Sequence, residues 1–217
     1  MPPRPRASLF GLALSAVIAV GATGASAAPI VTTVEAIGAG GFGPRAGATV
    51  IDFDAGLPSD PLIASTGSGF GLYTGSISGL TATPFGDTTQ YFSVGRGTTT
   101  IAFAEDNTYL GLLWGSVDSY NSLAFYDGAD LVGMITGDMI VDPATGDQGI
   151  GGTFYVNFDV ASGFDRIVLV STQYAFELDD LAYGQNTLVI PEPVAATLLA
   201  SGLLILGFTV RRVRRSS

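Results

Sequence analysis

Between residues 49 and 183 the chain alternates short runs of β-branched and aromatic residues with Gly, Asp and Asn, and this pattern restricts the fold most strongly. Run lengths and turn residues of this kind are typical of antiparallel strands. No stretch of 12 residues in this region has the apolar spacing of a helix. We therefore predict an all-β fold, an antiparallel two-sheet sandwich of the jelly-roll kind. The predicted strands are residues 49–53, 90–94, 98–104, 109–115, 122–127, 130–136, 153–160, 165–171 and 176–183.

The run at residues 153–160 shows the strand period directly. Successive side chains of a strand point to opposite faces, so four apolar residues share one face here. They are Phe154, Val156, Phe158 and Val160. Asp127-Gly128 predicts a hairpin turn of about three residues between two of the runs. Residues 28–48 are rich in Gly and Ala, so we expect a flexible entry segment there, followed by one β-sandwich domain at 49–188.

The N-terminus has the three parts of a secretory signal peptide. Two arginines precede an uncharged apolar stretch at residues 9–20, and small residues follow it at Ala25, Ala27 and Ala28. Twelve residues of helix rise about 18 Å, which is short of the ~30 Å hydrocarbon layer of a bilayer. We therefore predict a signal peptide at residues 1–27 that signal peptidase removes after export through the Sec translocon.

The C-terminus, residues 189–217, joins a Pro-Glu-Pro triplet to an uncharged apolar run and a basic tail. Residues 194–210 form a predicted membrane helix at the lower length limit for crossing a bilayer, with a basic tail at 211–217. Basic residues beside a span stay in the cytoplasm, which places the domain outside. The triplet fits two explanations equally, an extended protease substrate or ordinary punctuation at a helix start. The residues concerned are Pro191, Glu192 and Pro193 in the triplet and Arg211, Arg212, Arg214 and Arg215 in the tail.

The order of triplet, short apolar helix and terminal arginines resembles the PEP-CTERM sorting signal of Gram-negative bacterial surface proteins, which membrane-embedded exosortases process. The resemblance covers about the last 29 residues. It implies that Pro191, Glu192 and Pro193 are the processing signal and that the arginines retain the chain transiently in the inner membrane. It also implies a periplasmic domain before processing, and a place on the cell surface or in the extracellular matrix afterwards.

A second resemblance lies within the domain. "YLGLLWGSVDSYNSLAFYDGADLVGMITG" at residues 109–137 and "FELDDLAYG" at 176–184 are similar to the globular part of some exosortase-dependent surface proteins. That group usually has Asp-Asn where this chain has Asp179-Asp180. The resemblance implies a surface or matrix component, with exopolysaccharide as an expected partner, rather than a particular chemistry.

Composition excludes most enzyme classes. The chain has no His, Cys or Lys, so it cannot form a Ser-His-Asp triad, a thiolate nucleophile, a Schiff base or a usual zinc site. Between the two terminal segments the chain has three arginines and 18 acidic residues, so this region is strongly negative. This charge argues against nucleic-acid partners, because two polyanions repel. The remaining chemistry is that of carboxylates, either acid-base pairs or hard-cation binding.

Calcium is the metal that we consider for the acidic residues. Asp52 and Asp54 end an early run and Asp179 and Asp180 lie in the last one, so neighbouring strands would bring oxygen ligands together for a structural Ca²⁺. For glycoside cleavage, adjacent acids on a regular strand point to opposite faces, which makes Asp179 and Asp180 a poor acid-base pair. Turn-capping or solvated acids explain the same residues, because no loop has EF-hand spacing.

A ligand-binding surface is predicted around Tyr120 and Asn121, which lie in a connection, with Trp114 as a further contact or a core residue. Together these features predict an exported, exosortase-processed surface or matrix protein without a catalytic role. The alternatives are a calcium-dependent carbohydrate-binding module and, third, a carboxylate glycosidase.

Overall fold

The computed structural model describes residues 30–39 and 42–185, and this part of the chain is an antiparallel β protein. It confirms the predicted all-β class. Two single-turn 3₁₀ helices, Gly137–Met139 and Ile150–Gly152, are its only helical elements within these ranges. The strands are β1 Ile30–Ala36, β2 Thr49–Ile51, β3 Leu62–Gly67, β4 Phe70–Tyr73, β5 Tyr91–Val94, β6 Gly97–Gly115, β7 Asn121–Asp127, β8 Asp130–Thr136, β9 Phe154–Ser171 and β10 Phe176–Gly184.

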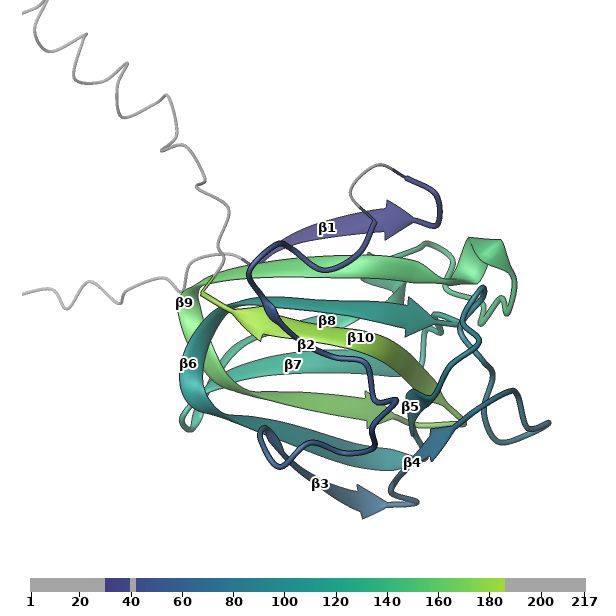
Figure 1. The fold of residues 1–217 in the computed structure, drawn as a ribbon, viewed down its shortest axis with the longest axis horizontal. Helices are drawn as coiled ribbons and strands as arrows, with labels where there is room; N and C mark the ends of the chain where they lie inside the picture. The colour runs from purple at the N-terminus through teal and green to yellow at the C-terminus, as the bar shows by residue number, and fades with distance from the viewer. Residues whose placement is uncertain (1–29, 40–41, 186–217) are drawn as a thin grey trace, which may run out of the picture.

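Hydrogen bonding joins all ten strands into one continuous sheet with the central order β4-β5-β10-β6-β9-β7-β8 (Figure 1). Two long strands, β6 and β9, make this continuity possible. The first half of β6 pairs with β3 and its second half with β10, while β9 pairs first with β1 and then with β7. The register between them shifts around Asn107, where the sheet bends. The four separate runs predicted at 98–104, 109–115, 153–160 and 165–171 are therefore two bent strands.

One apolar core joins the two parts of the sheet on either side of the bend. Phe125 of β7 contacts Phe158 of β9 edge to face at 5.4 Å, and both side chains are fully buried. Trp114 stacks on Phe176 at 4.3 Å within the same cluster. The predicted alternation in β9 is confirmed on its inner face, because Val156, Phe158 and Val160 all belong to this core.

The opposite face of β9 is also covered, which the sequence analysis did not predict. Tyr155, Asn157 and Asp159 are at most 2 % exposed. Residues 42–48 lie over them: Phe42 packs edge to face on Tyr155, and the Arg45 guanidinium binds the Asp159 carboxylate in a bidentate ion pair.

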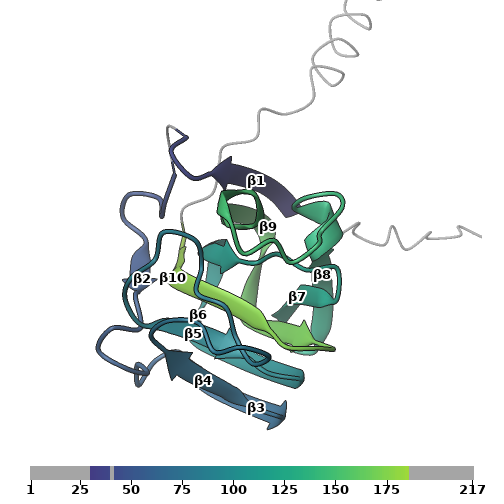
Figure 2. The same cartoon turned by 90° about the vertical axis from the view of Figure 1, so that its right-hand side faces the viewer.

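The predicted flexible entry segment is corrected by these contacts. Residues 30–36 form β1, which pairs with β9 from Ile30–Val160 to Ala36–Phe154 (Figure 2), and the residues after it form a cover. β1 contains no glycine and is rich in β-branched residues, and it was missed because residues 28–48 were judged together by their Gly and Ala content. β3 and β4 are short strands and were also missed, whereas the β7–β8 hairpin lies where Asp127-Gly128 predicted it.

The predicted signal peptide with Ala25, Ala27 and Ala28, and the whole sorting signal at residues 189–217, lie outside the described residues. Within residues 30–39 and 42–185, no helix is long and apolar enough to cross a membrane.

Candidate functional site

The outer face of β10 carries a cavity of about 490 Å³ that is lined by five aspartates, and we call it the acidic pocket. Its apolar lining consists of Ile37, Phe42, Phe85 and Leu113, and its acids are Asp52, Asp54, Asp87, Asp179 and Asp180. The structure thus brings together all four residues that were considered for calcium, and it adds Asp87. Whether a calcium ion binds them stays a prediction.

Pairing between β2 and β10 explains how the two pairs of acids meet. Leu181 pairs with Ile51, so the residues that follow β2 reach the acids of β10. A β-bulge follows Asp179, and Asp180 adopts a left-handed backbone with φ of 48°. The bulge breaks the regular alternation, so Asp179 and Asp180 line the same cavity. The prediction that they point to opposite faces was therefore wrong.

The acidic pocket leaves two buried carboxylate oxygens without a hydrogen-bond partner, Asp179 Oδ1 and Asp87 Oδ2. The other oxygen of Asp87 accepts bonds from the Thr89 backbone N–H at 2.8 Å and its hydroxyl at 2.9 Å. Asp54 is fixed by the Gln90 N–H at 3.0 Å. A turn bond at Asp87 and a long-range bond at Asp54 therefore orient the rim of the pocket, whereas the deepest acid keeps one oxygen without a donor.

The pKa of Asp179 is raised to about 8, first by burial and then by the charges of Asp180, Asp87 and Asp54, while a backbone hydrogen bond from Asp180 lowers it. The pKa of Asp180 is also raised, first by burial and then by Asp87, Asp52 and Asp54. Like charges and low solvent access both disfavour ionised carboxylates. A bound cation would reverse that preference.

Carboxylate spacing distinguishes the acidic pocket from a preformed metal site. Ca²⁺ holds its oxygens at about 2.3–2.6 Å, so its ligand atoms lie close to one another. Among the described residues, the one group of three acids whose ligand atoms all lie within 4.8 Å is Asp106, Asp127 and Asp165. The aspartates of the acidic pocket are spread more widely than that.

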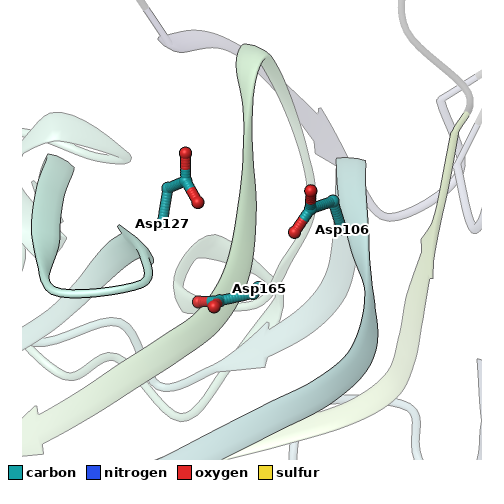
Figure 3. Close-up of side chains that lie close together, drawn as sticks. All are labelled: Asp106, Asp127 and Asp165. Atoms are coloured by element: carbon teal, nitrogen blue, oxygen red, sulfur yellow. The ribbon is translucent and has the colours of Figure 1, made fainter.

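This second cluster, which we call the bend cluster, lies where β6 and β9 bend and where β7 ends (Figure 3). Asp165 Oδ2 accepts a bond from the Gly128 N–H at 3.1 Å, and its Oδ1 is buried without a partner. Asp106 and Asp127 are exposed, so water solvates them. Exposed acids at turns are common without a metal, and the bend cluster by itself indicates no function.

A second cavity, of about 560 Å³, lies beside the acidic pocket and has polar walls, and we call it the polar pocket. The segment from Thr81 to Thr89 crosses between the two: its first residues line the polar pocket and its last ones the acidic pocket. Other walls come from Ser76, Asp118, Tyr120, Gln148, Tyr174 and Glu177.

Glu177 is the deepest acid of the polar pocket, with 1 % exposure, and both of its oxygens are occupied. Oε2 accepts the Ser116 hydroxyl at 2.6 Å, and Oε1 accepts the Ala82 N–H at 2.8 Å and the Thr81 hydroxyl at 3.3 Å. Burial raises its pKa, and these bonds lower it. Glu177 therefore ties three segments together.

The predicted ligand contacts separate into one pocket residue and two structural residues. Tyr120 lines the polar pocket and donates its hydroxyl to the Tyr174 carbonyl at 2.8 Å. Asn121 is 1 % exposed and bonds the Ala175 carbonyl and the Ser171 hydroxyl, while Trp114 is fully buried in the core. The predicted ligand contact is thus corrected for Asn121, which does not reach the surface, and of the two predictions for Trp114 the core position is confirmed.

Sequence reasoning missed Asp87 and Asp165, because each is a lone acid in a turn or bend with no neighbouring acid. Their partners come from segments far along the chain, and only the pairing of the strands brings them close. Asp-Thr-Thr at residues 87–89 carries an Asx-turn pattern, which was the one local feature that pointed to an ordered aspartate.

Comparisons with family models, with curated proteins and with solved structures give no match for this chain.

Proposed function

We propose that this chain is an exported surface or matrix component with a ligand-binding, non-enzymatic domain, whose sheet is a jelly-roll-like sandwich. The terminal sequences support export and exosortase processing through the PEP-CTERM resemblance. The observation that favours a non-enzymatic role is Glu177, the deepest acid of the polar pocket. In a chain without His, Cys or Lys, general acid-base chemistry falls to carboxylates. The deepest carboxylate of the larger pocket is occupied by three donors of the protein itself.

Processing is tested by the intact mass of the protein isolated from its native cells. We expect the mature protein to lack residues 1–27 and 194–217, and Glu192→Ala to leave the C-terminal part attached. The exposed Glu105 supplies the matched control, because Glu105→Ala removes the same charge at a position outside the triplet. A native protein that retains residues 194–217, unaffected by Glu192→Ala, would show a plain anchor.

A carbohydrate-binding role is the second candidate, and the polar pocket favours it. Its walls are hydroxyl, amide and backbone groups from Ser, Thr, Gln and Gly, and Tyr120 and Tyr174 add aromatic surface. Sugars bind to surfaces that combine hydrogen-bonding groups with aromatic rings. Calcium dependence would come from a separate acid cluster, since the wall carboxylates Asp118 and Glu177 belong to no group with metal spacing.

A glycan array with and without EGTA tests this second candidate. We expect binding that Tyr120→Ala abolishes and that Tyr126→Ala, near the opposite end of β7 and outside the pocket lining, leaves unchanged. Loss of binding in EGTA would add the calcium requirement. An array without any binding in either buffer would rule out the carbohydrate-binding candidate and leave the surface or matrix role intact.

A further inference from the structure

We propose that the acidic pocket is a binding site for an organic cation, namely an ammonium or guanidinium group carried on a short aliphatic stem. This inference goes beyond the proposed function and does not depend on export, on processing or on carbohydrate binding. It concerns the five aspartates around one cavity on the outer face of β10.

The charge of the pocket has no internal counterpart among the described residues. None of the residues that line it is basic, and the chain contains no Lys. The three arginines of the domain are engaged elsewhere: Arg45 with Asp159, Arg96 over the Tyr174 ring and Arg166 over the Tyr126 ring. No basic side chain of the domain therefore supplies a cation to the pocket.

The deepest acid points to the kind of group that the pocket accepts. Asp179 is only 4 % exposed and lines the cavity, yet its Oδ1 has no donor, and Oδ2 of Asp87, which lines the same cavity, has none either. Buried carboxylate oxygens normally accept hydrogen bonds, and leaving them unmade is costly. A ligand with several N–H donors supplies what both oxygens lack.

Size and lining favour an organic cation over a bare metal ion. A cavity of about 490 Å³ is in the range of small-molecule sites, and its aspartates lie too far apart for a shell of oxygens around one ion. The Phe42 and Phe85 side chains are 37 % and 44 % exposed at its edge, and Leu113 lies in its wall. Aromatic faces attract cations, and these apolar groups can pack against an aliphatic stem.

One ligand chemistry here has two sources. A free amine or guanidine and a Lys or Arg side chain of a partner polypeptide present the same charged group and the same stem. The experiment therefore compares butylguanidinium with a capped Gly-Arg-Gly peptide. The neutral isostere butylurea reports binding that does not depend on charge.

Calorimetric titration of the purified full-length chain in a nonionic detergent tests the site. We expect butylguanidinium to bind with one-to-one stoichiometry and butylurea not to bind. Asp179→Asn and Asp87→Asn should each weaken binding by about tenfold, because each removes a charged acceptor. Asp130→Asn, which removes the same charge from the exposed start of β8, should leave the affinity unchanged.

If the peptide binds at least as tightly as butylguanidinium, the source is a side chain of a partner. Tenfold weaker peptide binding indicates a free small molecule.

Three results would overturn the proposal. The first is absence of binding by both cationic probes, and the second is equal affinity in the wild type, Asp179→Asn and Asp87→Asn. The third is tight binding of CaCl₂ that neither probe competes with and that both variants abolish, which would make the pocket a metal site. Thermal unfolding followed by circular dichroism shows whether each variant is folded. If one variant does not fold, the other still tests the proposal.

Discussion

Glu177 and Asp179 are two residues apart on β10, point to the same outer face and are both almost fully buried, at 1 % and 4 % exposure. Glu177 accepts three hydrogen bonds from the segments that enclose it. Asp179 has an oxygen without any donor and four acidic neighbours around the same cavity. The Thr81–Thr89 segment lies between their pockets. It separates a carboxylate with donors on both oxygens from one with a buried oxygen that has no donor.

The difference shows that burial alone does not reveal what an acid does. Donors from Thr81, Ala82 and Ser116 make Glu177 part of the architecture, because its removal would leave those donors unpaired. Nothing in the described fold plays that part for Asp179 Oδ1, so this carboxylate costs stability in the ligand-free protein. One acid holds the fold together, and the other is available to a ligand.

The pH dependence of stability should show the largest effect. The folded-state pKa of Asp179, raised to about 8, lies above its ordinary value of 3.8. Its stabilising contribution is therefore complete below about pH 4 and is lost as pH rises toward about 8. We expect the free energy of unfolding to fall by up to ~1.4 kcal/mol per pH unit across that window. Urea titrations at several pH values, repeated on Asp179→Asn, check this slope.

In Asp179→Asn the slope should become shallower, and only the smaller contributions of other acids with raised pKa, including Glu177, should remain. Asp130→Asn is the matched control and should retain the wild-type slope. A slope that is the same in all three proteins would show that Asp179 ionises freely in the fold.

Removing the satisfied acid should give the next largest effect. Glu177→Ala leaves the Ser116 hydroxyl, the Thr81 hydroxyl and the Ala82 N–H without their acceptor, so we expect a loss of ~3 kcal/mol in the free energy of unfolding. Urea unfolding at pH 6 measures it. A loss below about 1 kcal/mol would mean that water replaces Glu177 easily.

The opposite sign is expected for the unsatisfied acid. Asp179→Asn keeps the shape of the side chain and removes an acid that must take up a proton when it is buried, so the ligand-free protein should gain ~2 kcal/mol at pH 7.5. Chemical denaturation of the same preparation used for ligand titration gives this value. A variant that is less stable than the wild type would place Asp179 with Glu177 as a structural acid.

Calcium should give the smallest effect and sharpens the same comparison. We expect millimolar CaCl₂ to raise the free energy of unfolding by less than ~1 kcal/mol, equally in the wild type and Asp179→Asn, because the pocket acids are too widely spaced. Differential scanning calorimetry with CaCl₂ and with EGTA measures the shift. A shift that only the wild type shows would support the calcium site at Asp52, Asp54, Asp179 and Asp180.

The sequence allowed the all-β class, the β7–β8 hairpin and the inner face of β9 to be predicted, because period 2 and turn chemistry are local properties. It did not allow prediction of the continuity of β6 and β9, since their bends at Asn107 and Gly163 look like ordinary turns. The cover over Tyr155 and Asp159 was missed because residues 42–48 carry no periodicity.

Four of the five acids of the acidic pocket were grouped from the sequence, again because of a regular feature of strands. Asp52, Asp54, Asp179 and Asp180 could be grouped because early and late strands often pair. Asp87 and the sharing of one cavity by Asp179 and Asp180 could not be predicted, since the first depends on a long-range contact and the second on a bulge. Tyr120 was predicted because it lies in a connection, and it is half-buried in the pocket wall. Asn121 beside it is buried, and it forms hydrogen bonds with Ser171 and Ala175.

The pairing of β1 with β9 also bears on the order of folding. Ile30 meets Val160, and Ala36 meets Phe154, so the first strand of the domain lacks its neighbour until more than two thirds of the chain is available. Contacts between residues so distant in sequence make folding slow and postpone its completion. During synthesis β1 therefore has no strand to pair with until β9 has been made.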